Sequence, residues 1–292
     1  MLNELYELSR SLCRLNVKVV SWHRFLKECP RGGTTFFVDV DASSKIVGLR
    51  QITDADRLSQ LRKYEKAAGY SFPSLNILPL WQFDEESHVE AATKLRKSLS
   101  SKNPPPSADV FNAATDLLKG ARSLWVDTDK KKGGRDAMDK VNGCLGSVVD
   151  DLSAIVAQTE DSDGRAFLTI LDRAKQFSGE LLHKQLSEWL VQQFHGSPDN
   201  WVIWFDLLFF VSGKKPKASS IVFELSDQSA FDYPVNHQRV YEFVNVCLQN
   251  VDSSIDSEKA PSGPDAFAAM DGGREESFPE VKMGSSGLSV LW

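Results

Sequence analysis

The amino-acid sequence indicates a mixed α and β protein of the α+β class, on three observations. A β-hairpin pattern lies near the N-terminus, amphipathic helical patterns fill the centre, and a second β-rich stretch followed by a helix precedes the C-terminal tail. We therefore expect an α+β N-terminal region at 1–103 and a helical region at 107–196. A second β-hairpin and helix at 201–250 would complete the core, and 251–292 would be an acidic flexible tail.

The N-terminal region begins with leucines spaced three and four residues apart, which is typical of an amphipathic helix. Two β-type runs, 34–41 and 45–52, are joined by a short Ala-Ser-Ser loop and predict a β-hairpin. Asp54 is expected to cap a helix that ends at Gly69. Residues 70–83 place two prolines among large apolar side chains, which predicts an extended, packed segment.

The centre of the chain has helical periodicity on both sides of the Pro-Pro-Pro break at 104–106. Charges at helical spacing indicate a helix within 84–101. Beyond the prolines, further helices are expected over 108–124, 136–158 and 163–195.

The third region returns to β structure. Residues 201–211 are apolar on both faces, which favours a buried strand in which the aromatic side chains pack in the core. The turn Gly213-Lys214-Lys215-Pro216-Lys217 would connect it to a second strand at 219–226, and a helix is expected over 237–248.

Charge and composition limit the function classes. Hydrophobic residues make up 41% and charged residues 25% of the 292 residues, as in ordinary globular proteins. The net charge is −6, and residues 251–280 account for it with eight acidic and two basic side chains, so any basic surface elsewhere must be local. The tail is rich in Ser, Gly and Pro, and its apolar end at Leu291 and Trp292 suggests a fragment of a longer protein.

The location expected from the sequence is the cytoplasm. The four cysteines are far apart and form no CxxC pair, as in a reducing compartment. The N-terminus does not read as a signal peptide. The longest strongly apolar run, 201–211, is too short to span a bilayer, so we expect no membrane contact.

No catalytic motif is present. The sequence contains no GxSxG, GxGxxG, GxxxxGK[ST] or HExxH pattern, so we expect no catalytic residues, no metal and no cofactor. One carboxylate pair is the exception, because Asp39 and Asp41 leave the same face of a strand and could hold Mg²⁺ as in palm-type enzymes. The alternative is that Asp41 begins the turn and Asp39 faces solvent.

Local basic clusters point to a nucleic-acid partner. Lysines and arginines beside flexible glycines can approach a phosphate backbone closely, and a basic hairpin can enter a groove. The residues we expect to bind nucleic acid are Lys130, Lys131, Lys132, Arg135, Lys214, Lys215, Lys217 and Arg31. A further basic group is Lys94, Arg96, Lys97 and Lys102. The alternative for each cluster is an ordinary solvated loop.

Two segments resemble a known family. FFVDVDASSKIVGLRQI at 36–52, which follows an N-terminal LNELYEL helix pattern, resembles the early hairpin of the large subunit of type I-C CRISPR surveillance complexes, the Csd family. IVFELSDQSAFDYPVNHQRVYEFVN at 221–245 is similar to that family's strand, YPV turn and helix. The chain lacks the family's C-terminal helical bundle and its glycine- and serine-rich central motif.

The resemblance implies a non-enzymatic role in antiviral defence. Such a subunit contacts other Cascade subunits and the crRNA 5′ handle, and reads a protospacer-adjacent motif on double-stranded target DNA, while base pairing reads the target. The basic loops would be its DNA- and RNA-binding contacts. The alternatives are a scaffold subunit without nucleic-acid contact and a Mg²⁺-dependent palm-type enzyme.

Overall fold

The computed structural model describes residues 11, 22–29, 34–126, 137–157, 162–211, 215–227, 233–259, 263–264 and 271–272. These residues form two compact units. The larger unit runs from Lys27 to Val244, and the smaller comprises the described residues up to Leu26 and from Asn245 onward. Within the smaller unit, the His23 backbone N–H donates a 2.6 Å hydrogen bond to the Asn245 side-chain oxygen.

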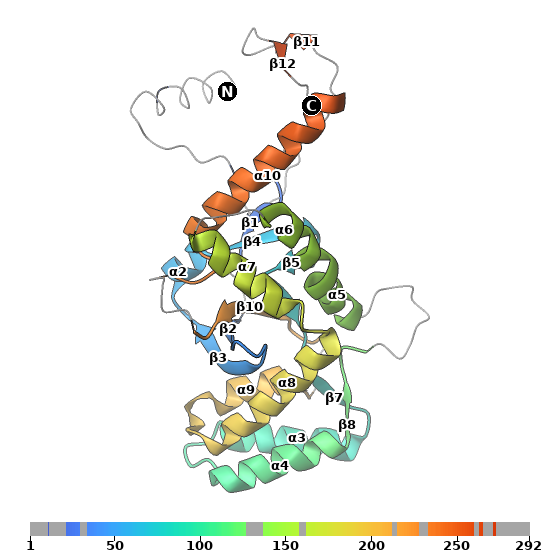
Figure 1. Cartoon of the computed structure of the whole chain (residues 1–292). Helices are drawn as coiled ribbons and strands as arrows, with labels where there is room; N and C mark the ends of the chain where they lie inside the picture. The colour runs from blue at the N-terminus through green and yellow to red at the C-terminus, as the bar shows by residue number, and fades with distance from the viewer. Residues whose placement is uncertain are drawn as a thin grey trace. The chain divides into compact units, whose positions relative to one another are not determined.

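The elements follow one another in mixed order along the chain (Figure 1). The strands are β1 (Leu26–Glu28), β2 (Thr35–Val40), β3 (Ile46–Ile52), β4 (Arg62–Ala67), β5 (Tyr70–Phe72), β6 (Ser74–Ile77), β7 (Trp81–Phe83), β8 (Ala121–Ser123), β9 (Phe209–Phe210), β10 (Ser219–Leu225), β11 (Gly263–Pro264) and β12 (Asp271–Gly272). The helices are α2 (Ala55–Gln60), α3 (Glu86–Leu99), α4 (Ser107–Lys119), α5 (Ala137–Gly143), α6 (Val149–Val156), α7 (Ser162–Ala174), α8 (Gly179–Gln192), α9 (Trp201–Leu208) and α10 (Gln238–Lys259). A π-helical turn, η2 (Cys144–Val148), joins α5 to α6, and the 3-10 turns η3 (Gln193–His195) and η4 (Pro198–Asn200) lie between α8 and α9.

The central sheet of the larger unit has the strand order β3-β2-β10-β6. Strands β2 and β3 form an antiparallel hairpin, whereas β10 joins β2 in parallel and β6 antiparallel. Smaller sheets have the orders β1-β4-β5 and β8-β7-β9. The expected α+β class and the hairpin within 34–52 are confirmed.

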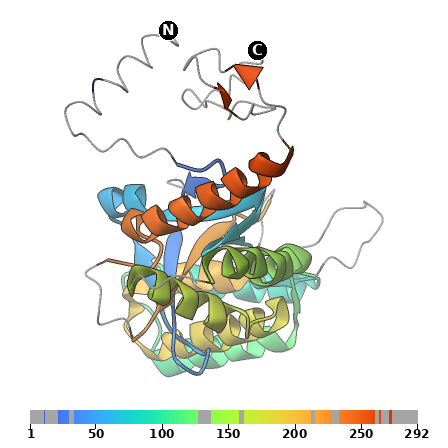
Figure 2. The same cartoon turned by 45° about the horizontal axis from the view of Figure 1, so that its top comes forward.

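The two faces of the central sheet differ. On one face Phe36 packs against Trp204 of α9, and Phe223 packs against Phe177, which follows α7. Figure 1 shows α3, α4, α8 and α9 grouped together, and Figure 2 shows the α5–α7 helices crossing in front of the strands. The opposite face carries a buried apolar cluster of Phe37, Ile52 and Val222 with Cys29, Leu58 and Leu61. This second face is where the polar side chains of the candidate site also lie.

The local turn chemistry of the N-terminal region follows the sequence. Asp41 closes the β2–β3 turn by accepting hydrogen bonds from the Ser43 and Lys45 backbone N–H groups, each at 2.9 Å. The Asp54 side chain caps α2 by accepting from the Asp56 and Arg57 N–H groups at 2.9 and 3.2 Å. Both aspartates satisfy donors that the chain reversal leaves unpaired.

The helix expected from Asp54 to Gly69 was wrong beyond its first turns. Helix α2 ends at Gln60, and residues 62–67 form β4 instead. Gly69 has a positive φ of 82° and makes the tight turn between β4 and β5, so it is a hairpin glycine rather than a helix cap.

The strand expected over 201–211 was also wrong. This segment is the helix α9 followed by the two-residue strand β9. Buried Trp201, Trp204, Phe205 and Leu208 recur at helical spacing, while exposed Asp206 faces outward. A continuous apolar run fits both periods, so the pattern alone did not decide between them. The aromatic side chains of α9 pack in the core as expected.

The second β-hairpin was wrong because β9 and β10 belong to different sheets. Strand β9 pairs in parallel with β7, and β10 pairs with β2 and β6. The helix expected over 237–248 is confirmed as the first part of α10.

The helical region is broken more often than the sequence indicated. The helix expected over 108–124 ends at Lys119 and is followed by β8. The helix expected over 163–195 is divided into α7 and α8, because the Ser178 side chain caps a new helix by accepting from the Leu181 N–H at 3.1 Å. The expected N-terminal helix and most of the tail lie outside the described residues. The tail was expected to begin at 251, which was wrong, because α10 continues to Lys259. Within the described part of the chain, no helix is long and apolar enough to cross a membrane.

Candidate functional site

The register of the paired strands places several polar side chains on one face of the central sheet. Asp39 of β2 lies opposite Gly48 of β3 and beside Glu224 of β10, while Phe37 lies opposite Arg50. Because side chains two residues apart leave the same face of a strand, all of these positions share one face. The sheet therefore brings two carboxylates and a guanidinium together next to the apolar cluster.

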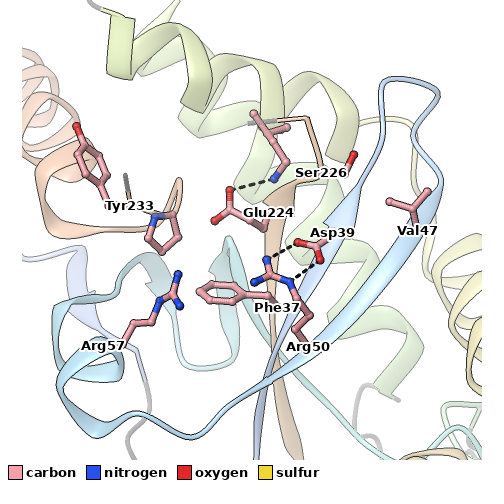
Figure 3. Close-up of a pocket in the computed structure, with 10 residues that line it drawn as sticks. Phe37, Asp39, Val47, Arg50, Arg57, Glu224, Ser226 and Tyr233 are labelled. Carbon is pink, nitrogen blue, oxygen red and sulfur yellow. Dashed lines mark hydrogen bonds and ion pairs between the residues drawn. The ribbon is translucent and has the colours of Figure 1, made fainter. Parts of the chain in front are cut away.

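A pocket of about 370 Å³ opens over this face (Figure 3). Strands β2, β3 and β10 supply most of its wall, α2 supplies one residue, and the segment before α10 closes one side. The lining residues are Phe37, Asp39, Val47, Arg50, Arg57, Glu224, Leu225, Ser226, Tyr233 and Pro234. This volume is in the range of small-ligand sites.

Asp39 and Arg50 form a two-pronged ion pair. Arg50 Nε donates to Asp39 Oδ2, and Arg50 Nη2 donates to Asp39 Oδ1, both at 2.7 Å. The hydrogen bonds to Asp39 raise the pKa of Arg50. Gly48 makes room for the pair, because a Cβ at this position would lie 2.7 Å from Asp39 Oδ2. The Arg50 side chain is 54% exposed, so its remaining donors can reach a ligand.

Glu224 forms a buried carboxyl group at the wall of the pocket, and its residue is only 4% exposed. Its Oε1 accepts from the Leu225 N–H at 3.0 Å, and its Oε2 accepts from the Val235 N–H at 2.9 Å. Burial raises the pKa of Glu224 to about 7, with a further rise from the charge of Asp39, against the lowering effect of the two backbone hydrogen bonds and Arg50. This carboxyl group therefore changes charge near neutral pH.

Arg57 of α2 supplies a cation without a carboxylate partner in the described part of the chain. Its guanidinium lies over the Phe37 ring at 5.5 Å, and that of Arg50 lies over the same ring at 5.3 Å. Figure 3 shows the Arg57 side chain reaching up into the pocket from below. An exposed guanidinium that is held on a ring and not neutralised is suited to binding an anion.

A further arginine, Arg239, lies beside the pocket next to two aromatic rings. The guanidinium of Arg239 lies 5.4 Å from the centre of the Tyr233 ring, and the Tyr233 and His237 rings are 4.9 Å apart. Burial lowers the pKa of His237, and the charges of Arg239, Arg62 and Arg57 lower it further. The neutral form of His237 also fits its contacts, since its Nδ1 accepts the Arg239 backbone N–H at 3.2 Å. Arg239 therefore adds one positive charge beside the pocket, while His237 is neutral.

Most of the basic residues expected from the sequence cannot be placed. Lys130, Lys131, Lys132, Arg135, Lys214 and Arg31 lie outside the described residues. Lys215 and Lys217 are exposed just before β10 begins, whereas Glu224 lies near its other end. At about 3.3 Å per residue, the first residue of β10, Ser219, is already roughly 17 Å from Glu224 along the strand, and neither lysine lines the pocket. The structure therefore does not bring these two lysines to the pocket.

The basic group on and just after α3 is partly neutralised by an ion pair. Arg96 forms a two-pronged pair with Asp206 of α9, with N–O distances of 2.5 and 2.7 Å. Lys94, Lys97 and Lys102 are exposed. Arg96 thus joins two helices and contributes little net charge to a ligand surface.

The carboxylate pair that suggested a palm-type metal site serves other contacts. Both oxygens of Asp39 accept from Arg50, and Asp41 Oδ1 accepts the hydrogen bonds of the turn. The turn role weighed for Asp41 is confirmed, whereas Asp39 is paired rather than simply solvated. Among the described residues, no three His, Cys, Asp or Glu side chains gather in a metal-binding group.

Comparison of this chain with protein-family models, with curated proteins and with solved structures finds no match. The candidate site therefore rests on its own geometry. Sequence reasoning missed Arg50, Arg57 and Glu224, because a strand arginine, a helix arginine and a strand glutamate carry no signal until the strands are paired.

Proposed function

We propose that this chain is a non-enzymatic nucleic-acid-binding subunit that contacts phosphate groups through the pocket on the central sheet. One observation carries this proposal. The two segments that resemble the type I-C large subunit, 36–52 and 221–245, lie side by side through the parallel pairing of β2 and β10. All lining residues of the pocket except Arg57 come from these two segments.

The charges of the pocket suit an anionic ligand. Arg57 has no carboxylate partner in the described part of the chain, and Arg50 keeps donors beyond those used by Asp39. Guanidinium groups bind phosphate oxygens in charge-assisted hydrogen bonds. The carboxylates of the site accept hydrogen bonds from Arg50 and from backbone N–H groups, so the arrangement supports binding more than catalysis.

The finer form of the proposal follows the resemblance. The chain would act within a type I CRISPR interference complex, with other Cascade subunits, crRNA and double-stranded target DNA as partners. Contacts to the crRNA handle and the protospacer-adjacent motif would come from the basic loops together with the pocket. Phosphate contacts would supply most of the affinity, and base contacts would supply the specificity.

An equilibrium titration of the full chain tests this proposal. Short duplex DNA and crRNA-like RNA are titrated at two salt concentrations, with the wild type and with Lys130, Lys131 and Lys132 replaced by Gln. Binding should weaken steeply with salt, and the triple variant should lower the salt slope by about 0.9 for each duplex DNA phosphate that its lysines no longer neutralise. The absence of binding at low salt would contradict the proposal and favour a scaffold subunit.

A further inference from the structure

The charge of the pocket depends on one proton. Arg50 and Arg57 each carry a positive charge, Asp39 carries a negative charge, and Glu224 is either negative or neutral. With Glu224 ionised, these four side chains are neutral in sum. With Glu224 protonated, they carry one net positive charge. An anion that enters the pocket therefore meets a more favourable field when Glu224 holds its proton.

The geometry fixes Glu224 where this charge matters. Its two oxygens are held by backbone N–H groups from β10 and from the segment after Pro234, so the carboxyl group cannot swing away to solvent. The neighbouring elements contribute ionisable groups of both signs. They are Asp39 from β2, Arg50 from β3, Arg57 from α2, Arg173 from α7 with its partner Asp227, and Tyr233 and His237 from the segment before α10.

Arg173 and His237 are less suited to respond to a ligand. Arg173 is paired through both terminal nitrogens with Asp227, at 2.8 Å each. His237 Nε2 lies 2.9 Å from Gln60 Oε1, and three nearby arginines oppose its protonation. Glu224 is better suited, because its pKa of about 7 leaves the protonated and ionised forms similarly populated near neutral pH.

We propose that the pocket binds one phosphate group of a nucleic acid through Arg57 and Arg50, and that Glu224 takes up a proton from solvent when it does. This inference rests on the proposed function and adds the ligand group and its linkage to pH. No covalent bond in the ligand forms or breaks. The phosphate raises the proton affinity of the adjacent carboxylate, and by reciprocity the proton raises the affinity for phosphate.

The expected size of the effect follows from the pKa of Glu224, which is about 7. If the ligand binds only the protonated form, affinity falls about tenfold between pH 6 and pH 8, and about half a proton is taken up per phosphate at pH 7.

The test uses a thymidine dinucleotide with one phosphodiester, because its single negative charge does not titrate in this range. Calorimetric titrations of the full chain at pH 7, in buffers with different heats of ionisation, measure the proton uptake directly. Wild type should take up about half a proton. Glu224→Gln should take up none and bind equally at pH 6 and pH 8, whereas His237→Gln should keep the uptake. Arg57→Gln should weaken binding at least tenfold, and the exposed Lys184→Gln on α8 should leave it unchanged.

The outcomes separate this inference from the function on which it rests. Dinucleotide binding by the wild type without proton uptake would overturn the inference and leave the proposed function standing. Binding of long nucleic acid without any dinucleotide binding would remove the pocket as the phosphate site. If Glu224→Gln does not fold by circular dichroism, the wild-type uptake and the His237→Gln control decide the matter.

Discussion

Glu224 should make the fold less stable as pH rises, which is opposite to the behaviour of a carboxyl group held in an ion pair. Burial raises its pKa from 4.5 to about 7, so the folded chain binds this proton more tightly than the unfolded chain does. The stability that the proton provides is present at low pH and is lost as pH rises from the unfolded value through the folded value. Since one pKa unit corresponds to about 1.4 kcal/mol, the loss between pH 5 and pH 8 is about 2–3 kcal/mol. The side chain is almost fully buried, so solvent screening does not reduce this figure.

Urea unfolding of wild type and Glu224→Gln at pH 5, 6, 7 and 8 measures this contribution. The substitution leaves one backbone N–H without its acceptor, which costs about 1–3 kcal/mol at every pH. The informative quantity is therefore how the difference in free energy of unfolding between the two proteins changes with pH. Burial lowers the pKa of His183 and His237, so both histidines add stability as pH rises toward 6.5, equally in the two proteins. The difference between wild type and variant should shrink by about 2–3 kcal/mol from pH 5 to pH 8. A difference that stays constant from pH 5 to pH 8 would mean that Glu224 does not bind its proton more tightly in the folded chain.

Three further substitutions test the support of the pocket. Gly48→Ala should lower the free energy of unfolding by about 1–3 kcal/mol, because its Cβ would overlap the Asp39 carboxylate. Urea unfolding measures this change. An unchanged midpoint would show that the Asp39–Arg50 ion pair can move aside. Arg173→Ala should cost about 1–3 kcal/mol in the same assay, since its half-buried guanidinium donates to the Val40 carbonyl at 2.7 Å. A decrease below about 0.5 kcal/mol, the size typical of a surface substitution, would contradict this role. Phe223→Ala should cost about 3–5 kcal/mol by thermal unfolding, because its fully buried ring packs against other aromatic rings; a cost of about 1 kcal/mol would mean that the core closes around the gap.

Local signals in the sequence predicted much of the fold. The hairpin within 34–52 was readable because its two β-type runs and the short loop that joins them lie within one short segment. The start of α10 was also readable, because the helical pattern of 237–248 lies within one short segment. The α9 segment was not, since its apolar residues satisfy strand and helix periods alike, and only packing against β2 decides between them.

The candidate site was harder to predict because it depends on pairing between distant strands. Nothing local in the sequence indicates that β10 lies parallel to β2, and this pairing places Glu224 beside Asp39. Arg57 lies in the first turn of the helix that Asp54 caps, and an arginine there is common on surface helices, so it gave no signal of a site. The basic loops drew attention because charge runs are visible in a single sequence, whereas a pocket built from single residues on several elements is not.

The salt dependence of duplex DNA binding, measured for Arg57→Gln and its matched control Lys184→Gln, tests whether the pocket binds phosphate. Each substitution removes one exposed positive charge, but only Arg57 lies in the pocket. If the pocket binds a phosphate, Arg57→Gln should weaken binding and lower the salt slope by about 0.9, while Lys184→Gln should match the wild type. Equal effects of the two substitutions would contradict the claim that this pocket contacts the phosphates of a nucleic acid.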